Sequence, residues 1–298
     1  MSVQSKEVSE QTMAALESKE VKSYSAARRR RRILVNVLRV LFIVVIIGGW
    51  ELGVRWKLPG AKDPVIDPFF WGQPSGIWAQ LVTWVTQGTA QGPLWEQIAV
   101  TIEEAILGFV IGAVLGVVFG IVLGRNRFLA DVLGPYVKVA NSIPRVTLAP
   151  LFAILLGLGM QSKVALAVVL VFFIVFFNAF QGVREVDRNL LANARILGAN
   201  PRRITTAVII PSALTWIFAS LHTSFSFALV GAVVGEFIGA YQGIGLLIQN
   251  AGSNFNPNGV FAAMVILAVV ALLSEFLITA LERRLLRWKP NTVSDVTI

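Results

Sequence analysis

The chain has 298 residues, of which 55% are hydrophobic and only 14% charged, and its mean hydropathy is +0.71. A soluble domain carries roughly 25% charged residues, so this composition excludes an ordinary water-soluble fold and favours a protein that resides in lipid. The net charge of +9 does not indicate nucleic-acid binding, because the basic residues cluster at the ends of apolar runs, where they act as topology signals.

The chain begins with a polar segment that ends in five consecutive arginines, Arg28 to Arg32. A targeting or nucleic-acid tract is one interpretation of this segment. We favour a disordered cytoplasmic arm, residues 1–32, whose arginines anchor the first membrane helix against anionic lipid. The apolar stretch 33–54 is long and no small-residue cleavage site follows it, so we expect an uncleaved membrane helix and not a signal peptide.

Apolar stretches of membrane-spanning length recur along the rest of the chain. A hydrocarbon core of roughly 30 Å requires about 20 apolar residues in a helix. After 33–54, the candidate spans are 100–123, 144–158, 164–183, 212–234 and 260–281. The third is short and contains Pro144, and Pro135 precedes it, so we expect a broken, partly re-entrant helix to lead into it. The predicted fold class is therefore all-α, a polytopic membrane protein with about six transmembrane helices.

The segment between the first two spans, together with the first span, forms a region 33–99 that we assign to a membrane helix and an outer loop. Ser75 is expected to cap a short helix through about Thr86, and its apolar periodicity suits a helix that lies in the membrane interface. Tryptophans of this region fit an aromatic belt at the outer surface. In the second span, Gly108, Gly112, Gly116 and Gly120 recur every four residues, which predicts close helix packing in the bundle centre or at a dimer seam.

The distribution of basic residues predicts the topology. Segments assigned to the cytoplasm hold 22 of the 26 lysines and arginines, and the outer segments hold Arg55, Lys57, Lys62 and Lys163. This asymmetry obeys the positive-inside rule and places both termini in the cytoplasm.

No pattern in the chain predicts catalysis. The nearest approach to a phosphate-binding loop, Gly157 to Lys163, lacks the glycine before the lysine, so we expect no ATP hydrolysis by this chain. There is no cysteine and one histidine, which excludes a multi-histidine or thiolate metal site. An integral-membrane enzyme is disfavoured because nucleophile, base and metal ligands do not cluster, and a secondary transporter because inverted repeats with ion sites are absent.

The cytoplasmic loop 184–211 is where a partner could act. Leu190, Leu191, Ala194 and Leu197 are expected on one face of a short helix, beside Arg188 and Arg195. Gly198 ends this helix, Asn200 caps a second one, and Pro201 occupies its first position. Such a helix pair is too short to span a membrane. It either docks into a groove on another protein or lies on its own bundle.

This loop resembles the cytoplasmic EAA loop of ABC-importer permeases, in which a glycine is followed after a fixed gap by an I-x-L-P ending. Here Gly198 and the segment Val208 to Pro211 take those places. Further segments are similar to the nitrate, sulfonate and taurine branch of the family, namely Ser142 to Pro150, Phe176 to Arg184 and Gly235 to Ile248. One departure is that Ala192-Asn193-Ala194 replaces the Glu-Ala-Ala of the motif, and Glu185 or Asp187 could substitute for the missing acid.

The resemblance implies a type I ABC-importer permease fold, with a core domain 100–283 and a cytoplasmic tail 284–298. It implies a homodimer in the bacterial inner membrane, a binding protein that delivers substrate, and an ABC ATP-binding subunit that carries ATP and Mg. The residues expected to couple to that subunit are Arg188, Leu190, Leu191, Ala194, Arg195, Leu197, Gly198 and Pro211. The family suggests a sulfonate-, taurine- or nitrate-like anion as substrate, although related branches carry neutral or aromatic metabolites and vitamin precursors.

Polar residues within the spans are candidates for the translocation pathway. Thr215, His222 and Ser226 are spaced to share one face of the fifth span, and polar groups in membrane helices turn away from lipid. Asn178 is a similar candidate in the fourth span. Glu236 lies in a motif for which the resemblance implies a gating or a structural role. Whether the face of Thr215 meets a cavity or another helix is left open by the sequence.

Overall fold

The computed structural model describes residues 3–57 and 64–285, and it omits the side chains of 3–28, of Arg188 and of 281–285. Contacts divide the chain into two units, 1–75 and 76–298, and each is described by itself. The described residues form helices and two isolated β-bridges, and none of them forms a β-strand. Five of the helices are long and apolar enough to cross a membrane, or six elements if one bent helix pair is counted as a span. This confirms the predicted fold class.

The first unit consists mainly of α1 (Val3–Arg55), followed by the short α2 (Pro68–Trp71). The apolar part of α1 that could span a membrane is Arg29–Arg55. The preceding arm, which we expected to be disordered, is helical from Val3. The physical reason is that no glycine or proline occurs before Gly48, so nothing in the arm interrupts a helix.

The boundary between the units falls in α3 (Pro74–Thr86). The expected short helix is present, but Pro74 is its first residue, so Ser75 is not the cap. Instead Ser75 is bound to Glu51 of α1, whose carboxylate accepts the Ser75 backbone N–H at 3.0 Å and its hydroxyl at 2.9 Å. Glu51 also pairs with Arg55 at 2.6 Å.

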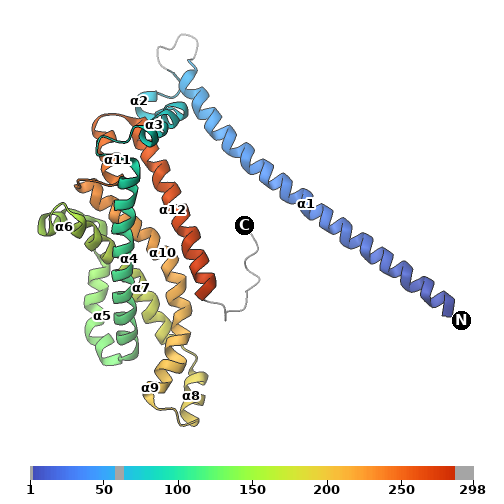
Figure 1. Ribbon diagram of the computed structural model, residues 1–298. Helices are drawn as coiled ribbons and strands as arrows, with labels where there is room; N and C mark the ends of the chain where they lie inside the picture. The colour runs from blue at the N-terminus through green and yellow to red at the C-terminus, as the bar shows by residue number, and fades with distance from the viewer. Residues whose placement is uncertain (1–2, 58–63, 286–298) are drawn as a thin grey trace. The chain divides into compact units, whose positions relative to one another are not determined.

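The centre of the second unit is formed by α4 (Leu94–Arg125), α7 (Met160–Arg184) and α10 (Ile210–Ile238), which run side by side (Figure 1). The four regularly spaced glycines of α4 face α7. A Cβ added at Gly112 would lie 2.8 Å from the Val171 Cβ, and one added at Gly120 would lie 2.6 Å from the Ala179 Cβ. The glycine repeat therefore packs two helices of the bundle centre against each other, as the small-residue spacing predicted.

The third predicted span, 144–158, is wrong as placed. The helix over this region is α6 (Ala149–Leu156), which is too short to cross a membrane, and the longer helix is α5 (Arg127–Ser142). The α5 segment and the segment Arg145–Leu156 meet at an angle of 82°. Pro144 explains the break, because the residue before a proline is driven to extended backbone, and Ile143 has φ −71° and ψ 128°.

Lys138 lies on α5, which begins directly after Asn126. Arg145 likewise begins the short 3₁₀ turn Arg145–Leu148. The predicted break is confirmed at Pro144, whereas α5 continues through Pro135, and the re-entrant arrangement stays a prediction.

The remaining elements of the second unit lie at its two ends and along its side (Figure 1). At one end are α8 (Arg188–Ile196) and α9 (Pro201–Ile204), which continue through a π turn (Thr205–Ile209) into α10. At the other end is α11 (Ile244–Ser253), and α12 (Pro257–Leu285) runs beside the bundle.

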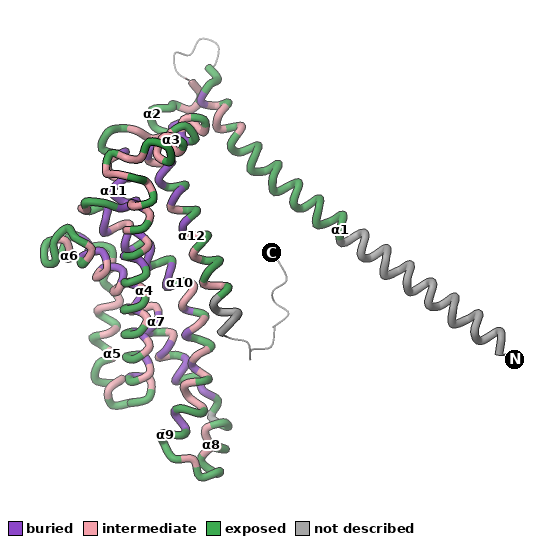
Figure 2. The backbone as a smooth tube through the Cα atoms, in the orientation of Figure 1, coloured by how far each residue is buried: buried purple, intermediate pink, exposed green. Residues whose placement is uncertain are grey.

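Burial is concentrated on the facing sides of the central helices, as Figure 2 shows. The largest buried cluster includes Val171 and Val175 of α7 with Leu229 of α10. Large apolar side chains nevertheless cover the outside, for example Val114, Leu272 and Phe276, which are 58%, 70% and 72% exposed. Such a surface requires lipid or another apolar partner as its surroundings.

Candidate coupling surface and pathway residues

The helix pair α8–α9 is built by local hydrogen bonds that the sequence specifies. Asp187 caps α8 by accepting the Asn189 backbone N–H at 2.8 Å, and Asn200 caps α9 by accepting the Arg203 backbone N–H at 2.8 Å. Gly198 joins the two with a φ of +77°, in the left-handed region that favours glycine. The predicted stop at Gly198 and cap at Asn200 are therefore present.

The helix pair exposes several large apolar side chains. Leu190 is 51% exposed and Leu197 86% exposed, and Ile196, which sequence reasoning missed, is 82% exposed. Leu191 and Ala194 are half-buried, so the four predicted residues do not form one uniformly exposed face. Exposed apolar side chains of this kind, at the end of a short helix, are what a groove on a partner protein accommodates.

Pro211 and Arg188, which were also predicted to couple to a partner, are not among the exposed residues described above. Pro211 lies in the first turn of α10, beyond the π turn, and is not part of the helix pair. The Arg188 side chain lies outside the described part of the chain.

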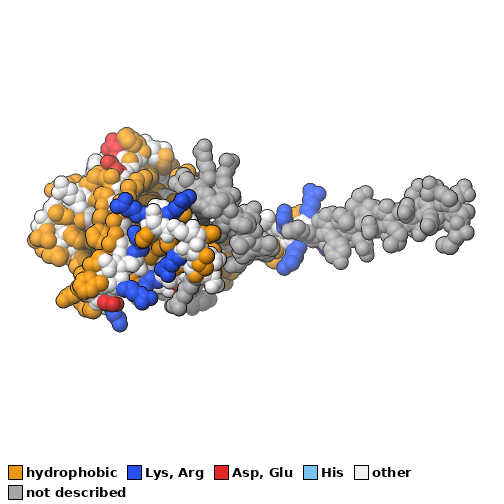
Figure 3. Space-filling view, turned by 90° about the horizontal axis from the view of Figure 1, so that it is seen from below, with side chains coloured by type: hydrophobic (Ala, Val, Ile, Leu, Met, Phe, Trp, Pro, Cys, Tyr) orange, Lys and Arg blue, Asp and Glu red, His pale blue; other side chains and the backbone are white. Residues whose placement is uncertain are grey.

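Basic side chains surround the apolar tip. Seen from the end that carries α8 and α9, the second unit shows lysine and arginine side chains around apolar ones (Figure 3). The exposed arginines of this end are Arg125, Arg127, Arg184, Arg195, Arg202 and Arg203. This charge is what the positive-inside rule expects of a cytoplasmic face.

The pathway candidates on α10 lie on one face, as predicted. Thr215 and Ser226 are exposed, so the second unit leaves the two ends of this face uncovered. His222 is half-buried, and its Nδ1 lies 2.9 Å from the Glu275 Oε1 of α12. Asn178 of α7 donates its amide to the Ile174 carbonyl at 2.8 Å, which satisfies one of its two N–H groups within its own helix.

Glu236, the remaining candidate, is fully buried at the end of α10 that lies next to α11. Its Oε1 accepts a hydrogen bond from the Thr101 hydroxyl at 2.7 Å, and its Oε2 accepts the Gly245 backbone N–H at 2.6 Å. Thr101 in turn accepts the Ile244 backbone N–H at 2.9 Å. Through these hydrogen bonds Glu236 holds the start of α11 in place. In the described residues it does not line an open passage.

Sequence reasoning missed most of the residues around Glu236. Gln97, Thr101 and Glu104 form a buried polar stripe on α4, and Gln97 accepts the Gly243 backbone N–H at 2.9 Å. Their spacing of four and three residues within an apolar span was the available signal. Lys163, which we placed in an outer loop, is instead in the first turn of α7 and is 1% exposed.

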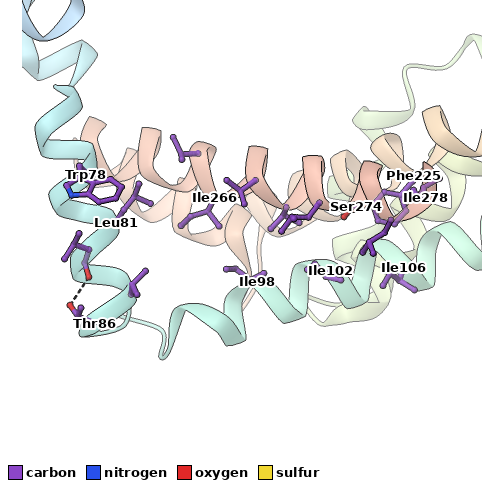
Figure 4. Close-up of a pocket in the computed structure, with 17 residues that line it drawn as sticks. Trp78, Leu81, Thr86, Ile98, Ile102, Ile106, Phe225, Ile266, Ser274 and Ile278 are labelled. Atoms are coloured by element: carbon purple, nitrogen blue, oxygen red, sulfur yellow. Dashed lines mark hydrogen bonds between the residues drawn. The ribbon is translucent and has the colours of Figure 1, made fainter. Parts of the chain in front are cut away.

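One groove of the second unit is almost entirely apolar. It has a volume of about 980 Å³ and runs between α3, α4 and α12, with Phe225 of α10 at one end (Figure 4). Thr86 and Ser274 are the polar residues among those that line it, and the Thr86 hydroxyl is already bonded to the Val82 carbonyl at 2.8 Å. This lining offers almost no group that could recognise a polar solute, so we do not regard the groove as a substrate site.

The fold and the two ends of the second unit define a multi-pass helical membrane protein with exposed apolar side chains among arginines at one end. The chain belongs to the family of binding-protein-dependent transport system inner membrane components, whose model matches residues 112–287. This confirms the family resemblance in the sequence. Members of the family are transport permeases, so this chain is a transport subunit and not an enzyme, and ATP hydrolysis belongs to a separate subunit.

Several characterised proteins are similar to this chain. The riboflavin transport system permease of Chloroflexus aurantiacus is 38% identical over 205 residues, which is 69% of this chain and 76% of that protein. A putative aliphatic sulfonates transport permease of Bacillus subtilis is 35% identical, over 66% of this chain and 72% of that protein. The taurine transport system permease of Escherichia coli is 29% identical, over 80% of this chain and 86% of that protein.

Solved structures support the fold. An inward-facing form of the MetNI methionine ABC transporter matches with a TM-score of 0.52 and 23% identity, over 64% of this chain and 93% of that chain. The type I importer permease fold predicted from the sequence is therefore confirmed.

Proposed function

We propose that this chain works as a homodimeric permease that imports a small solute, with one ATP-binding subunit docked on the α8–α9 pair of each protomer. The observation that supports this most directly is the exposure of Leu190, Ile196 and Leu197 on a helix pair that is too short to span a membrane. ATP-driven closure of the two ATP-binding subunits would move these helix pairs. Because α9 continues into α10, that movement would be transmitted to the spans.

Both termini lie in the cytoplasm in this proposal, and a binding protein delivers the solute at the end that carries α11. The relatives transport, by their names, sulfonates, taurine and riboflavin. The candidate pathway face of α10 offers hydroxyls and one histidine but no lysine or arginine. We therefore place substrate selectivity in the binding protein, with a sulfonate-like anion as the first candidate and an aromatic vitamin or other neutral metabolite as the second.

The docking role is tested by Leu197→Asp. Because the Leu197 side chain is 86% exposed, an aspartate there costs the isolated permease almost nothing, whereas in an apolar groove it is unpaired. We expect association with the ATP-binding subunit to weaken by at least about tenfold and uptake to fall with it, while the amount of permease in the membrane is unchanged.

Asn189→Asp is the control, since it adds the same charge at an exposed position in the first turn of α8, whereas Leu197 caps the other end of that helix. Leu197 is a better test position than Leu191, whose partial burial would confuse loss of docking with loss of local packing. Normal uptake by Leu197→Asp at normal subunit stoichiometry would exclude this surface as the docking site.

The pathway role is tested by Thr215→Cys and Ser226→Cys, because the chain contains no native cysteine to react. We expect small water-soluble thiol reagents to modify both positions in one nucleotide state of the transporter and to modify them less in another. Ser224→Cys is the control, since Ser224 is fully buried between helices. Equal reactivity of all three positions in every state would assign Thr215 and Ser226 to helix packing.

A further inference from the structure

Two glutamates and one lysine meet inside the second unit, at the end that carries α11. Glu104 of α4 is 2% exposed, Glu236 of α10 is 0% exposed and Lys163 of α7 is 1% exposed. The Thr101 hydroxyl, one helical turn before Glu104 on α4, donates to the Glu236 carboxylate at 2.7 Å. Lys163 packs against Gly235, the residue before Glu236, because a Cβ at Gly235 would lie 2.9 Å from the Lys163 Cγ. We call these three residues the Glu104–Glu236–Lys163 cluster.

The hydrogen bonds of Glu236 identify it as the charged carboxylate of the cluster. Both of its oxygens already accept a hydrogen bond, one from the Thr101 hydroxyl and one from the Gly245 backbone N–H at the start of α11. An ionised carboxylate only accepts hydrogen bonds, and negative charge is favoured at the N-terminus of a helix. Glu236 therefore matches its surroundings best in the charged form.

Glu104 is in the opposite situation. Its Oε2 is buried and meets no hydrogen-bond partner among the described residues. Two adjacent ionised carboxylates would face each other with acceptors only, and the single charge of Lys163 offsets only one of them. The Lys163 ammonium group also donates to the Leu158 carbonyl.

Among the side chains that the structure describes on the packed elements, no other charged group relieves the conflict. On α4 the neighbouring Glu103 is exposed, and α11 contains no charged residue. A buried, unpaired carboxylate costs several kcal/mol, on the order of the loss caused by breaking a buried ion pair. A single added proton removes both the charge imbalance and the clash between acceptors.

We infer that Glu104 is a neutral carboxylic acid that donates a hydrogen bond to the Glu236 carboxylate, and that it thereby positions Glu236 to hold α11. The cluster is then electrically neutral, with Lys163 as the counter-ion of Glu236. Glu104 is in this sense a positioning residue, because it acts on α11 only through Glu236.

The glycines of the segment Gly235 to Gly245 fit this arrangement. A Cβ on Gly235 would lie 2.9 Å from the Lys163 Cγ, and a Cβ on Gly243 would overlap the Glu236 carboxyl group. A Cβ on Gly245 would overlap the Val233 carbonyl oxygen. These positions must lack side chains for Lys163 and the start of α11 to approach Glu236.

The presence of the proton is tested by infrared spectroscopy of the full-length permease, assembled with its ATP-binding subunits in lipid bilayers at neutral pH. We expect a carbonyl stretching band of a protonated carboxylic acid in the parent protein, and its loss in Glu104→Gln. Glu275→Gln is the control and should keep the band, because the Glu275 side chain is 51% exposed. Absence of the band in the parent, or a heat stability that depends on sodium ions, would overturn the inference in favour of an ionised Glu104 with a bound cation.

The position of the proton is tested by comparing two amide variants. Glutamine at 104 still donates to Glu236, so Glu104→Gln should retain heat stability and uptake within about twofold, whereas Glu104→Ala removes the donor and should lower both. Glutamine at 236 places an N–H group against a donor, so Glu236→Gln should lower uptake by about tenfold or more. The reverse ranking, or equal losses in both amide variants, would overturn the assignment of the proton to Glu104, and full activity of both would overturn the positioning role.

The infrared band does not depend on transport. A preparation that shows the band but imports no solute would contradict the proposed function and leave this inference standing.

Discussion

At the scale of single residues, the backbone conformation at Gly198 determines the effect of a substitution there. Its φ is +77°, and a Cβ added to it would meet no atom within 4 Å. Any loss of stability or docking on substitution of Gly198 therefore arises from backbone strain and not from a steric clash. The turn lies outside the packed helices, so such strain should affect docking before it affects membrane insertion.

Gly198→Val should cost about 1–3 kcal/mol locally, because a β-branched residue is strained in the left-handed region. We expect normal amounts of permease in the membrane, reduced co-purification of the ATP-binding subunit and reduced uptake. Gly198→Asn is the matched control and should behave nearly as the parent, because asparagine tolerates this region. If valine and asparagine had the same effect, the turn geometry would not matter for coupling.

Residue-level features were predictable from the sequence when their causes are local. The stop at Gly198 and the cap at Asn200 depend on residues within one helical turn, and both are present. Lys163 and Glu104 were not recognised, because their significance depends on where α4, α7 and α10 come together. No local pattern distinguishes Lys163 from a lysine that marks the edge of a membrane.

At the scale of elements, the α4–α7 contact is the closest helix pairing in the second unit that carries a recognisable sequence pattern. Gly120→Ala tests it, since the new Cβ would lie 2.6 Å from the Ala179 Cβ and 2.7 Å from the Phe176 carbonyl oxygen. We expect a loss of about 1–3 kcal/mol, as for other overpacked cores, measured as a lower unfolding temperature of the purified permease.

Gly134→Ala in α5 is the control for this test. An added Cβ there meets nothing within 4 Å, and alanine favours a helix over glycine by about 1 kcal/mol, so stability should be unchanged or higher. Equal unfolding temperatures for Gly120→Ala and the parent would show that α4 and α7 can separate at no cost.

The spans were predictable in proportion to their apolar length. Helices are present over all four of the other predicted spans after the first, namely 100–123, 164–183, 212–234 and 260–281. Each helix is longer than the apolar stretch that predicted it. The third was misplaced because α5 carries Asp131 and Lys138, so the most apolar stretch lay beyond the break at Pro144. Pro144 revealed that a break exists, but the sequence did not show on which side the longer helix lies.

At the scale of the whole molecule, the two ends of the second unit have different chemistry, and this predicts its orientation. The end with α8 and α9 carries exposed arginines, whereas α11 at the opposite end carries no charged residue. Reporter fusions at Arg195 should therefore report the cytoplasm and fusions at Gly252 the outer side. Signals from the same side at both positions would contradict a membrane between these ends.

The π turn Thr205–Ile209 determines how insertions and deletions affect the orientation of the α8–α9 pair. A π turn holds one residue more than the corresponding stretch of α-helix, and here Ile210 alone separates it from Pro211. Deleting one residue between 205 and 209 would allow a regular helix to run from α9 into α10. Because the π turn accommodates its additional residue locally, this deletion would leave the tip formed by α8 and α9 in nearly the same orientation. A deletion in the regular part of α10 would instead rotate the tip around the helix axis by about 100°, the turn per residue of an α-helix, while leaving every amino acid on the tip unchanged.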